Sequence, residues 1–187
     1  YRILKNAIKE NNVKVFYQPI VDTKTKEIKK YECLVRLVDP NGDIFSPAHF
    51  LDIAKRTRLY PHITKTVIEQ AADMFRDGNV DFSVNLSVMD IVNAETTTFI
   101  KKVVIDNHLQ HHIIFEILES EGIESFKEVV LFIDEMKKLG CRFAIDDFGT
   151  GYSNFEYLLK LNVDYLKIDG SLIKVVHTDP NAKTIVE

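Results

Sequence analysis

Residues 142–168 read RFAIDDFGTGYSNFEYLLKLNVDYLKI, two apolar stretches separated by a more polar one. We interpret Arg142–Asp146 as a strand, Ser153–Lys160 as a helix and Val163–Ile168 as a second strand. Strands joined through a helix over a dozen or more residues run parallel, whereas two residues are enough to join an antiparallel pair. The segment therefore predicts a β-α-β unit.

The same alternation extends toward the N-terminus. Further strands are predicted at Asp81–Leu86 and His112–Leu118. Repeated strand–helix alternation indicates a parallel sheet covered by helices, either a barrel or an open doubly wound sheet. The predicted helices are one that begins at Ser46-Pro47 and runs toward Lys55, then Ile63–Phe75, Thr97–Asn107, and Phe126–Leu139, which Gly140 ends.

A different pattern precedes this alternation. Val13–Asp22 and Ile28–Leu37 are both typical of strands, and only the polar turn Thr23–Glu27 separates them. So short a connection predicts an antiparallel hairpin. We therefore expect six strands in all, the first antiparallel to the others.

Composition limits the kind of protein. The 187 residues are 45% hydrophobic with a formal net charge of −4, so a sizeable core is possible and a basic face for duplex nucleic acid is not expected. The two cysteines, Cys33 and Cys141, are not in a metal-ligand spacing, which favours a reducing, cytoplasmic location. We interpret Tyr1 as a sign that the chain was cut from a longer protein, which can carry a membrane anchor elsewhere; a processed natural terminus is the alternative.

Ionisable and amide side chains recur where the predicted strands end. In a β/α barrel the active site lies at the C-terminal ends of the strands. A buried carboxylate is costly unless it is paired or binds a metal, although any one of these acids could instead form a salt bridge or cap a helix. The oxygen ligands suit Mg²⁺ or Mn²⁺. The residues are Glu32 within the second strand, Asn85, Glu116, Asp146 and Asp147 at the ends of the next three, and Lys167 and Asp169 at the sixth.

Strand periodicity orders these residues further. Glu32, Leu34 and Arg36 share one face of their strand, while Cys33 points the other way and is expected to be a small buried hydrophobe. Lys167 and Asp169 likewise share a face. The adjacent pair Asp146-Asp147 could serve two metal ions, an arrangement that suits in-line displacement at a phosphodiester.

At these positions the sequence resembles the EAL-domain family of cyclic-di-GMP phosphodiesterases. The resemblance rests on six motifs in family order, and one departure is Cys33, where the family signature has alanine. The motifs are Tyr17-Gln18-Pro19-Ile20, Glu32-Cys33-Leu34-Val35-Arg36, Asn85-Leu86-Ser87, Glu116-Ile117-Leu118-Glu119, Asp146-Asp147-Phe148-Gly149-Thr150-Gly151-Tyr152-Ser153 and Leu166-Lys167-Ile168-Asp169.

The resemblance implies a modified TIM-like (β/α)8 barrel with an antiparallel first strand, and a role for each motif. Glu119 would brace the loop from Phe148 to Ser153, which couples the interface of a homodimer to the metal site. The implied metal ligands are Glu32, Asn85, Glu116 and Asp146 for a first ion, and Asp146 and Asp147 for a second. The implied catalytic residues are Glu32, Asp146, Asp147 and Lys167, of which Lys167 would hold or activate the attacking water. The implied contacts to the dinucleotide are Gln18, Leu34, Arg36 and Asp169.

The implied function is hydrolysis of cyclic-di-GMP to the linear dinucleotide in bacterial second-messenger signalling, with Mg²⁺ or Mn²⁺ and under the control of flanking regulatory domains. Two alternatives remain. One is a receptor module that binds cyclic-di-GMP without cutting it, although every metal-binding acid that the chain covers is present. The other is an unrelated metal-dependent barrel hydrolase.

We also expect residues 1–187 to be a C-terminally incomplete domain and a poor catalyst alone. The family continues through further strand-end motifs, one of which supplies a carboxylate to the second metal. A full β/α barrel has eight strands, so six would leave unpaired edges at the first and the sixth. Asp179-Pro180 has the form of a helix start.

Overall fold

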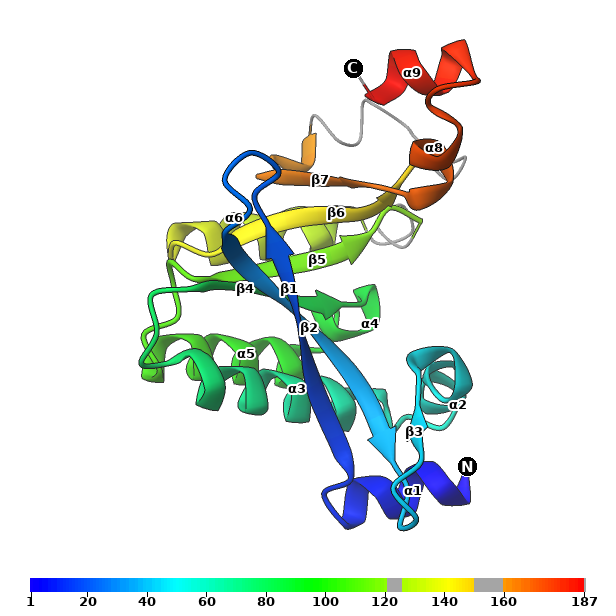
Figure 1. Cartoon of the computed structure of the whole chain (residues 1–187). Helices are drawn as coiled ribbons and strands as arrows, with labels where there is room; N and C mark the ends of the chain where they lie inside the picture. Colours follow the sequence, from blue (N-terminus) through cyan, green and yellow to red (C-terminus); the bar gives the residue numbers. More distant parts are fainter. Residues whose placement is uncertain (121–125, 150–159, 187) are drawn as a thin grey trace.

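A single mixed sheet forms the centre of the molecule. The structure, a computed structural model, describes residues 1–120, 126–149 and 160–186 (Figure 1). The strand order is β1-β2-β4-β5-β6-β7, with the short β3 paired to β2. The strands are β1 (Val13–Val21), β2 (Ile28–Val38), β3 (Ile44–Phe45), β4 (Asp81–Leu86), β5 (Ile113–Leu118), β6 (Arg142–Phe148) and β7 (Tyr165–Ile168).

Strand directions confirm the predicted α/β fold class. β1 pairs antiparallel with β2, so the hairpin prediction is correct. From β2 onward each neighbour in the order is parallel, which includes the β6–β7 unit in residues 142–168. The predicted helix Ser153–Lys160 lies, except for its last residue, outside the described residues.

The helices largely follow the predicted alternation. The helix predicted from Ser46 toward Lys55 was wrong as one element, because the backbone leaves helical geometry at Phe50, which has φ −140° and a side chain buried in the core. The helices are α1 (Arg2–Lys9), the 3₁₀ turn η1 (Pro47–His49), α2 (Leu51–Arg56), α3 (Tyr60–Phe75), α4 (Val88–Ile91), α5 (Ala94–Asp106), α6 (Phe126–Lys138), α8 (Gly170–Val175) and α9 (Pro180–Val186).

Apolar side chains on the outer face of the sheet form the core against α3, α5 and α6. Phe82 of β4 is fully buried and stacks on Phe75 of α3 with ring centroids 4.5 Å apart. Phe143 of β6 meets Phe132 of α6 edge to face at 6.0 Å. Because strand side chains alternate, packing these residues outward turns the polar residues between them toward the inner face.

The sheet curls so that β2 and β7 approach each other across this inner face. Two side-chain pairs join them: Lys167 with Glu32 at 3.2 Å, and Lys30 over the ring of Tyr165 at 4.5 Å. The curl is that of a barrel rather than of an open doubly wound sheet. Over the described residues β1 and β7 form the two edges of the sheet and are not paired with each other. No described helix is both long enough and apolar enough to cross a bilayer.

Candidate metal centre

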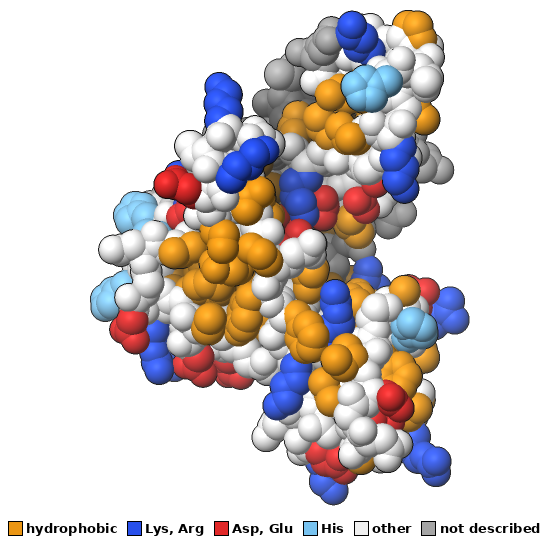
Figure 2. All heavy atoms as spheres, viewed as in Figure 1, with side chains coloured by type: hydrophobic (Ala, Val, Ile, Leu, Met, Phe, Trp, Pro, Cys, Tyr) orange, Lys and Arg blue, Asp and Glu red, His pale blue; other side chains and the backbone are white. Residues whose placement is uncertain are grey.

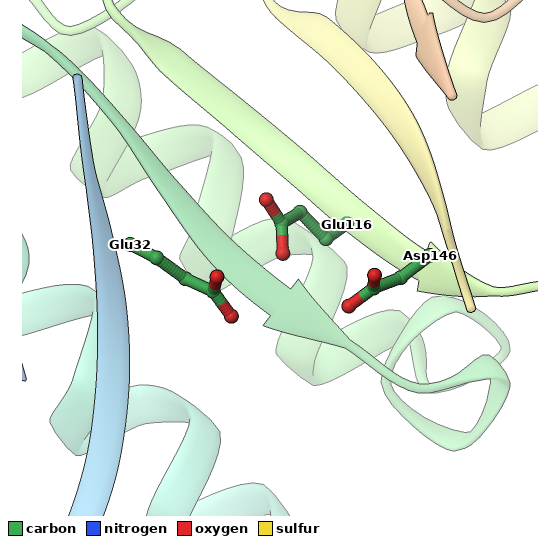
Figure 3. Close-up of side chains that lie close together, drawn as sticks. All are labelled: Glu32, Glu116 and Asp146. Atoms are coloured by element: carbon green, nitrogen blue, oxygen red, sulfur yellow. The ribbon is translucent and has the colours of Figure 1, made fainter. Parts of the chain in front are cut away.

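Three carboxylates from separate strands converge on the inner face. Glu32 of β2, Glu116 of β5 and Asp146 of β6 each place one oxygen within 4.8 Å of the others (Figure 3). Parallel pairing explains the convergence, because the C-terminal ends of β5 and β6 lie side by side and the curl brings β2 opposite. The structure thus brings together Glu32, predicted within the second strand, and Glu116 and Asp146, predicted at strand ends.

Asn85 joins this group from β4. It lies directly beside Glu116 in the parallel register, and its side-chain amide donates a hydrogen bond to Oε1 of Glu32 at 3.4 Å. An amide at this position can orient the carboxylate of Glu32 and offer an oxygen of its own. The role of Asn85 as a metal ligand stays a prediction.

Lys167 of β7 supplies the positive charge among the carboxylates. Its ammonium donates to Glu116 at 2.6 Å, to Asp146 at 3.0 Å and to Glu32 at 3.2 Å. Burial by itself would lower the pKa of Lys167, but the neighbouring carboxylates, Glu116 first, outweigh burial and raise the pKa above its ordinary value. Three carboxylates against one ammonium leave a surplus of two negative charges, which matches a divalent cation.

Glu116 has the least favourable surroundings for a carboxylate. Its side chain is fully buried, and among the described residues Oε1 has no hydrogen-bond partner. Burial raises its pKa, Lys167 opposes that effect and Glu32 adds to it. A buried carboxylate with an unpaired oxygen is stabilised by a metal ion. The oxygen donor set also fits the hard cations Mg²⁺ and Mn²⁺.

Asp147 lies beside the three acids rather than among them. A regular strand would turn Asp147 to the face opposite Asp146, but the β6–β7 register shifts between Ile145 and Phe148 and Asp147 has φ +57°. Its pKa is raised by burial and then by the charges of Asp146 and Asp169. The bulge therefore keeps the carboxylate of Asp147 near the centre.

Glu119 holds the chain just after β6. Its Oε2 accepts a hydrogen bond from the backbone N–H of Gly149 at 3.1 Å, and its own N–H donates to the carbonyl of Asp146 at 3.1 Å. Glu119 therefore fastens both sides of Asp147. The rest of the predicted braced loop, from Thr150 to Ser153, lies outside the described residues.

The predicted dinucleotide contacts occupy the rim of the centre. Gln18 is exposed on β1 directly opposite Glu32, and Leu34 follows on the same face of β2. Arg36 lies further along β2. Its guanidinium donates a hydrogen bond to the carbonyl of Val35 at 2.8 Å and lies 5.8 Å from the centre of the Phe16 ring. These three positions leave the face above Glu32 available to a ligand.

Asp169 lies past the end of β7. Its carboxylate caps α8 by accepting the N–H of Ser171 at 2.8 Å, and the bonds to Ser171 lower its pKa. Asp169 lies beyond the last residue of β7, so the alternation of side chains that predicted a shared face with Lys167 does not extend to Asp169. Its charge still acts on Asp147.

A cavity of about 280 Å³ next to the acids was not predicted. The pairing of β2 with β4 ends at Cys33 and Val84, and beyond that point the two strands diverge. Side chains of α2 and α3 line the resulting space, which reaches Glu32, Asn85 and Asp146. A divergence of two strands depends on tertiary packing, so the sequence carried no signal for it.

Together, the fold and the site define a curled β/α sheet with an acidic cluster on its inner face that could hold a metal ion. The family model of the EAL domain matches residues 2–187, and the chain belongs to the EAL-domain family. The six ordered motifs had indicated this family.

Similar proteins agree with this assignment. The chain is 32% identical to "Cyclic di-GMP phosphodiesterase PdeB" of Shewanella oneidensis, over 98% of the chain and 22% of PdeB. It is 31% identical to "Signaling protein YkoW" of Bacillus subtilis, over 98% of the chain and 24% of YkoW. The chain thus spans about a quarter of the length of these relatives.

Solved structures show the same fold. The structure described as "PaMucR Phosphodiesterase, c-di-GMP complex" superposes with a TM-score of 0.89 at 28% identity, covering 99% of this chain and 78% of that one. The FimX EAL domain from Pseudomonas aeruginosa bound to c-di-GMP also gives 0.89, at 25% identity, over 99% and 76%.

Proposed function

We propose that the protein is a metal-dependent phosphodiesterase that opens cyclic-di-GMP to the linear dinucleotide. The observation that carries the proposal is the surplus negative charge of Glu32, Glu116 and Asp146 over Lys167 at the mouth of the sheet. Proteins of the same family, such as PdeB, are named for this activity. We take Mg²⁺ or Mn²⁺ as the ion.

The residues divide the work of the reaction. Glu32, Asn85, Glu116 and Asp146 would hold one ion, and Asp147 with Asp146 would hold a second. Bound divalent ions supply a nucleophilic water of lowered pKa and neutralise charge on the phosphate. Lys167, already within hydrogen-bond distance of three ligands, is placed to orient the attacking water and to keep a positive charge beside the phosphate.

The residues at the rim of the centre would bind the dinucleotide. The guanidinium of Arg36 can pair with a phosphate in a two-point manner, because the neutral carbonyl of Val35 that it now contacts is a weaker partner than a phosphate. Gln18 and Leu34 flank it on the same side, and Asp169 borders the site from β7. We assign all four to the substrate.

The protein is further proposed to work as a homodimer under the control of flanking domains. α4 packs against α6, and both expose apolar side chains: Met89, Val92 just after α4, and Leu131. Glu119 lies between β5 and α6 and accepts a hydrogen bond from Gly149 beside the metal centre. A second copy that covered α4 and α6 would therefore contact the helix that follows Glu119 in the chain. The length of the relatives supports flanking domains, and free, buried Cys33 and Cys141 agree with a cytoplasmic location.

The test combines turnover and binding. The chain and the full-length protein are each incubated with cyclic-di-GMP and Mn²⁺, and products are separated by chromatography. We expect the linear dinucleotide from the full-length protein and none with a chelator. Tight binding with no product at any metal concentration would instead establish a receptor module.

A further inference from the structure

Beneath the acids a second layer of polar side chains crosses the inner face. Arg142, at the start of β6, contacts Asp81 of β4 at 2.7 Å and donates to the carbonyl of His111 at 2.8 Å. Its other nitrogen donates to the hydroxyl of Tyr165 on β7 at 3.0 Å. The ammonium of Lys30 on β2 lies 4.5 Å from the centre of the Tyr165 ring. Tyr165 is thus held by β6 and by β2 together.

These contacts are electrostatically consistent with one another. Asp81 raises the pKa of Arg142, an effect that burial opposes, so the guanidinium remains a firm donor to Tyr165. A cation over an aromatic face is attracted by the electrons of the ring, and more strongly where the pair is shielded from water. The layer joins strands far apart in the sheet.

β7 is an edge strand with little backbone pairing to fix its position. In the described part of the chain it pairs only with β6, over a register that shifts after Ile145. Asp164, just before β7, anchors it to β6 by accepting the N–H of Phe143 at 2.8 Å. On the outer face Leu166 is about half exposed and supports the strand little. The inner side chains therefore decide how far β7 leans toward β2.

We propose that Tyr165 is a positioning residue for Lys167. Tyr165 and Lys167 are separated by one position on β7, so both side chains lie on the inner face. The contacts of Tyr165 with Arg142 and Lys30 therefore fix the position of the strand. That position determines where the ammonium of Lys167 contacts the carboxylates of Glu32, Glu116 and Asp146. The inference rests on the proposed function: its effect on turnover requires hydrolysis of cyclic-di-GMP, whereas its effect on Mn²⁺ affinity requires only that the acids bind the ion.

The ammonium of Lys167 opposes a divalent ion at the same carboxylates, because like charges repel. Loosening Lys167 should therefore tighten metal binding while it slows the reaction. General loss of structure would weaken both. This opposite movement is a readout that a merely structural role of Tyr165 would not produce.

The experiment measures the Mn²⁺ dissociation constant by calorimetry and the turnover of cyclic-di-GMP on the full-length protein. For Tyr165→Leu we expect Mn²⁺ to bind a few-fold more tightly and kcat to fall about ten-fold, the lower end of what partners of metal ligands contribute, with KM unchanged. Tyr165→Phe keeps the ring under Lys30 and should show a smaller change in the same directions. The control is Tyr17→Phe, which loses a comparable hydrogen bond, to the carbonyl of Gln70 at 3.1 Å on the outer face, and should change neither quantity.

A double-mutant cycle decides how Tyr165 acts. In a Lys167→Met background, Tyr165→Leu should alter neither Mn²⁺ affinity nor turnover further, because the group that it positions is gone. An effect of Tyr165→Leu that persists in that background, or weaker Mn²⁺ binding in the single variant, would overturn the proposal. If the parent protein does not hydrolyse cyclic-di-GMP, the proposed function fails while the Mn²⁺ measurements still decide the role of Tyr165.

Discussion

Burial of the Glu116 carboxylate is costly, yet the proposed metal site requires its negative charge. Its side chain is fully buried, one oxygen has no hydrogen-bond partner among the described residues, and Lys167 partly offsets its charge. A core residue selected for packing alone would be apolar here, like its neighbours Phe115 and Ile117. Binding of a metal ion, as proposed, would account for a carboxylate at this position.

At the same scale, Glu32→Gln should separate metal binding from folding. The substitution keeps the size of the side chain but removes one of three negative charges. We expect turnover to fall by orders of magnitude and Mn²⁺ affinity to fall, because the remaining charge surplus is halved. Calorimetry and product analysis measure the two effects, and circular dichroism checks the fold. A variant with unchanged Mn²⁺ affinity would remove Glu32 from the ligand set.

Arg36→Ala should act on affinity. It removes a donor to a phosphate, and a hydrogen bond to a charged group contributes about 1.5–3 kcal/mol, so KM should rise about ten- to a hundred-fold with a smaller change in kcat. Arg2→Ala, on the exposed side of α1, is the control and should behave as the parent. Unchanged KM and kcat for Arg36→Ala would show that the inner face of β2 does not receive the substrate.

At the scale of elements, the turn after β6 depends on a glycine. Gly149 has φ +97°, and a Cβ at this position would overlap Cδ1 of Leu172. Gly42 has a similar φ of +91° but nothing within 4 Å. Gly149→Ala should therefore lower the free energy of unfolding by more than the roughly 1 kcal/mol expected from strain alone at Gly42→Ala. Urea denaturation of both variants measures the difference, and equal losses would contradict the packing at Leu172.

Helices and strands were predictable where the local sequence pattern was strong. Asp81–Leu86 was predicted with its correct bounds because polar and apolar residues alternate along it. The helix predicted from Thr97 begins three residues earlier, at Ala94, because Asn93 caps it by accepting the N–H of Thr96. The short α4 and α8 gave too little periodicity to be predicted. The bulge at Asp147 could not be predicted, since periodicity places that residue on the wrong face.

At the scale of the whole molecule, the fold brings distant residues together. Glu32 and Lys167 meet from β2 and β7, near opposite edges of the sheet (Figure 1). Figure 2 shows acidic and basic side chains next to each other in the hollow below the C-terminal helices. Sequence motifs predicted the members of this centre, but not the contact of Lys167 with three acids, the cavity or the layer around Tyr165, because each depends on how the sheet curls.

A centre assembled from four strands should link metal binding to global stability. A ligand that binds only the folded state stabilises it by about 2.7 kcal/mol at a concentration a hundred times its Kd. We expect Mn²⁺ to raise the Tm of the chain and Glu116→Gln to abolish the rise. Ca²⁺ should stabilise less and inhibit turnover, because its larger and looser coordination suits this compact site poorly. A rise in Tm that survives Glu116→Gln would place the ion elsewhere.

Metal-dependent hydrolysis is tested most directly by following cyclic-di-GMP with the full-length protein, its Glu32→Gln variant and excess chelator in parallel. We expect the linear dinucleotide as the product with Mn²⁺ or Mg²⁺, and no product from the variant or in chelator. Undiminished hydrolysis in chelator, or by Glu32→Gln, would contradict a mechanism based on metal held by the strand-end carboxylates.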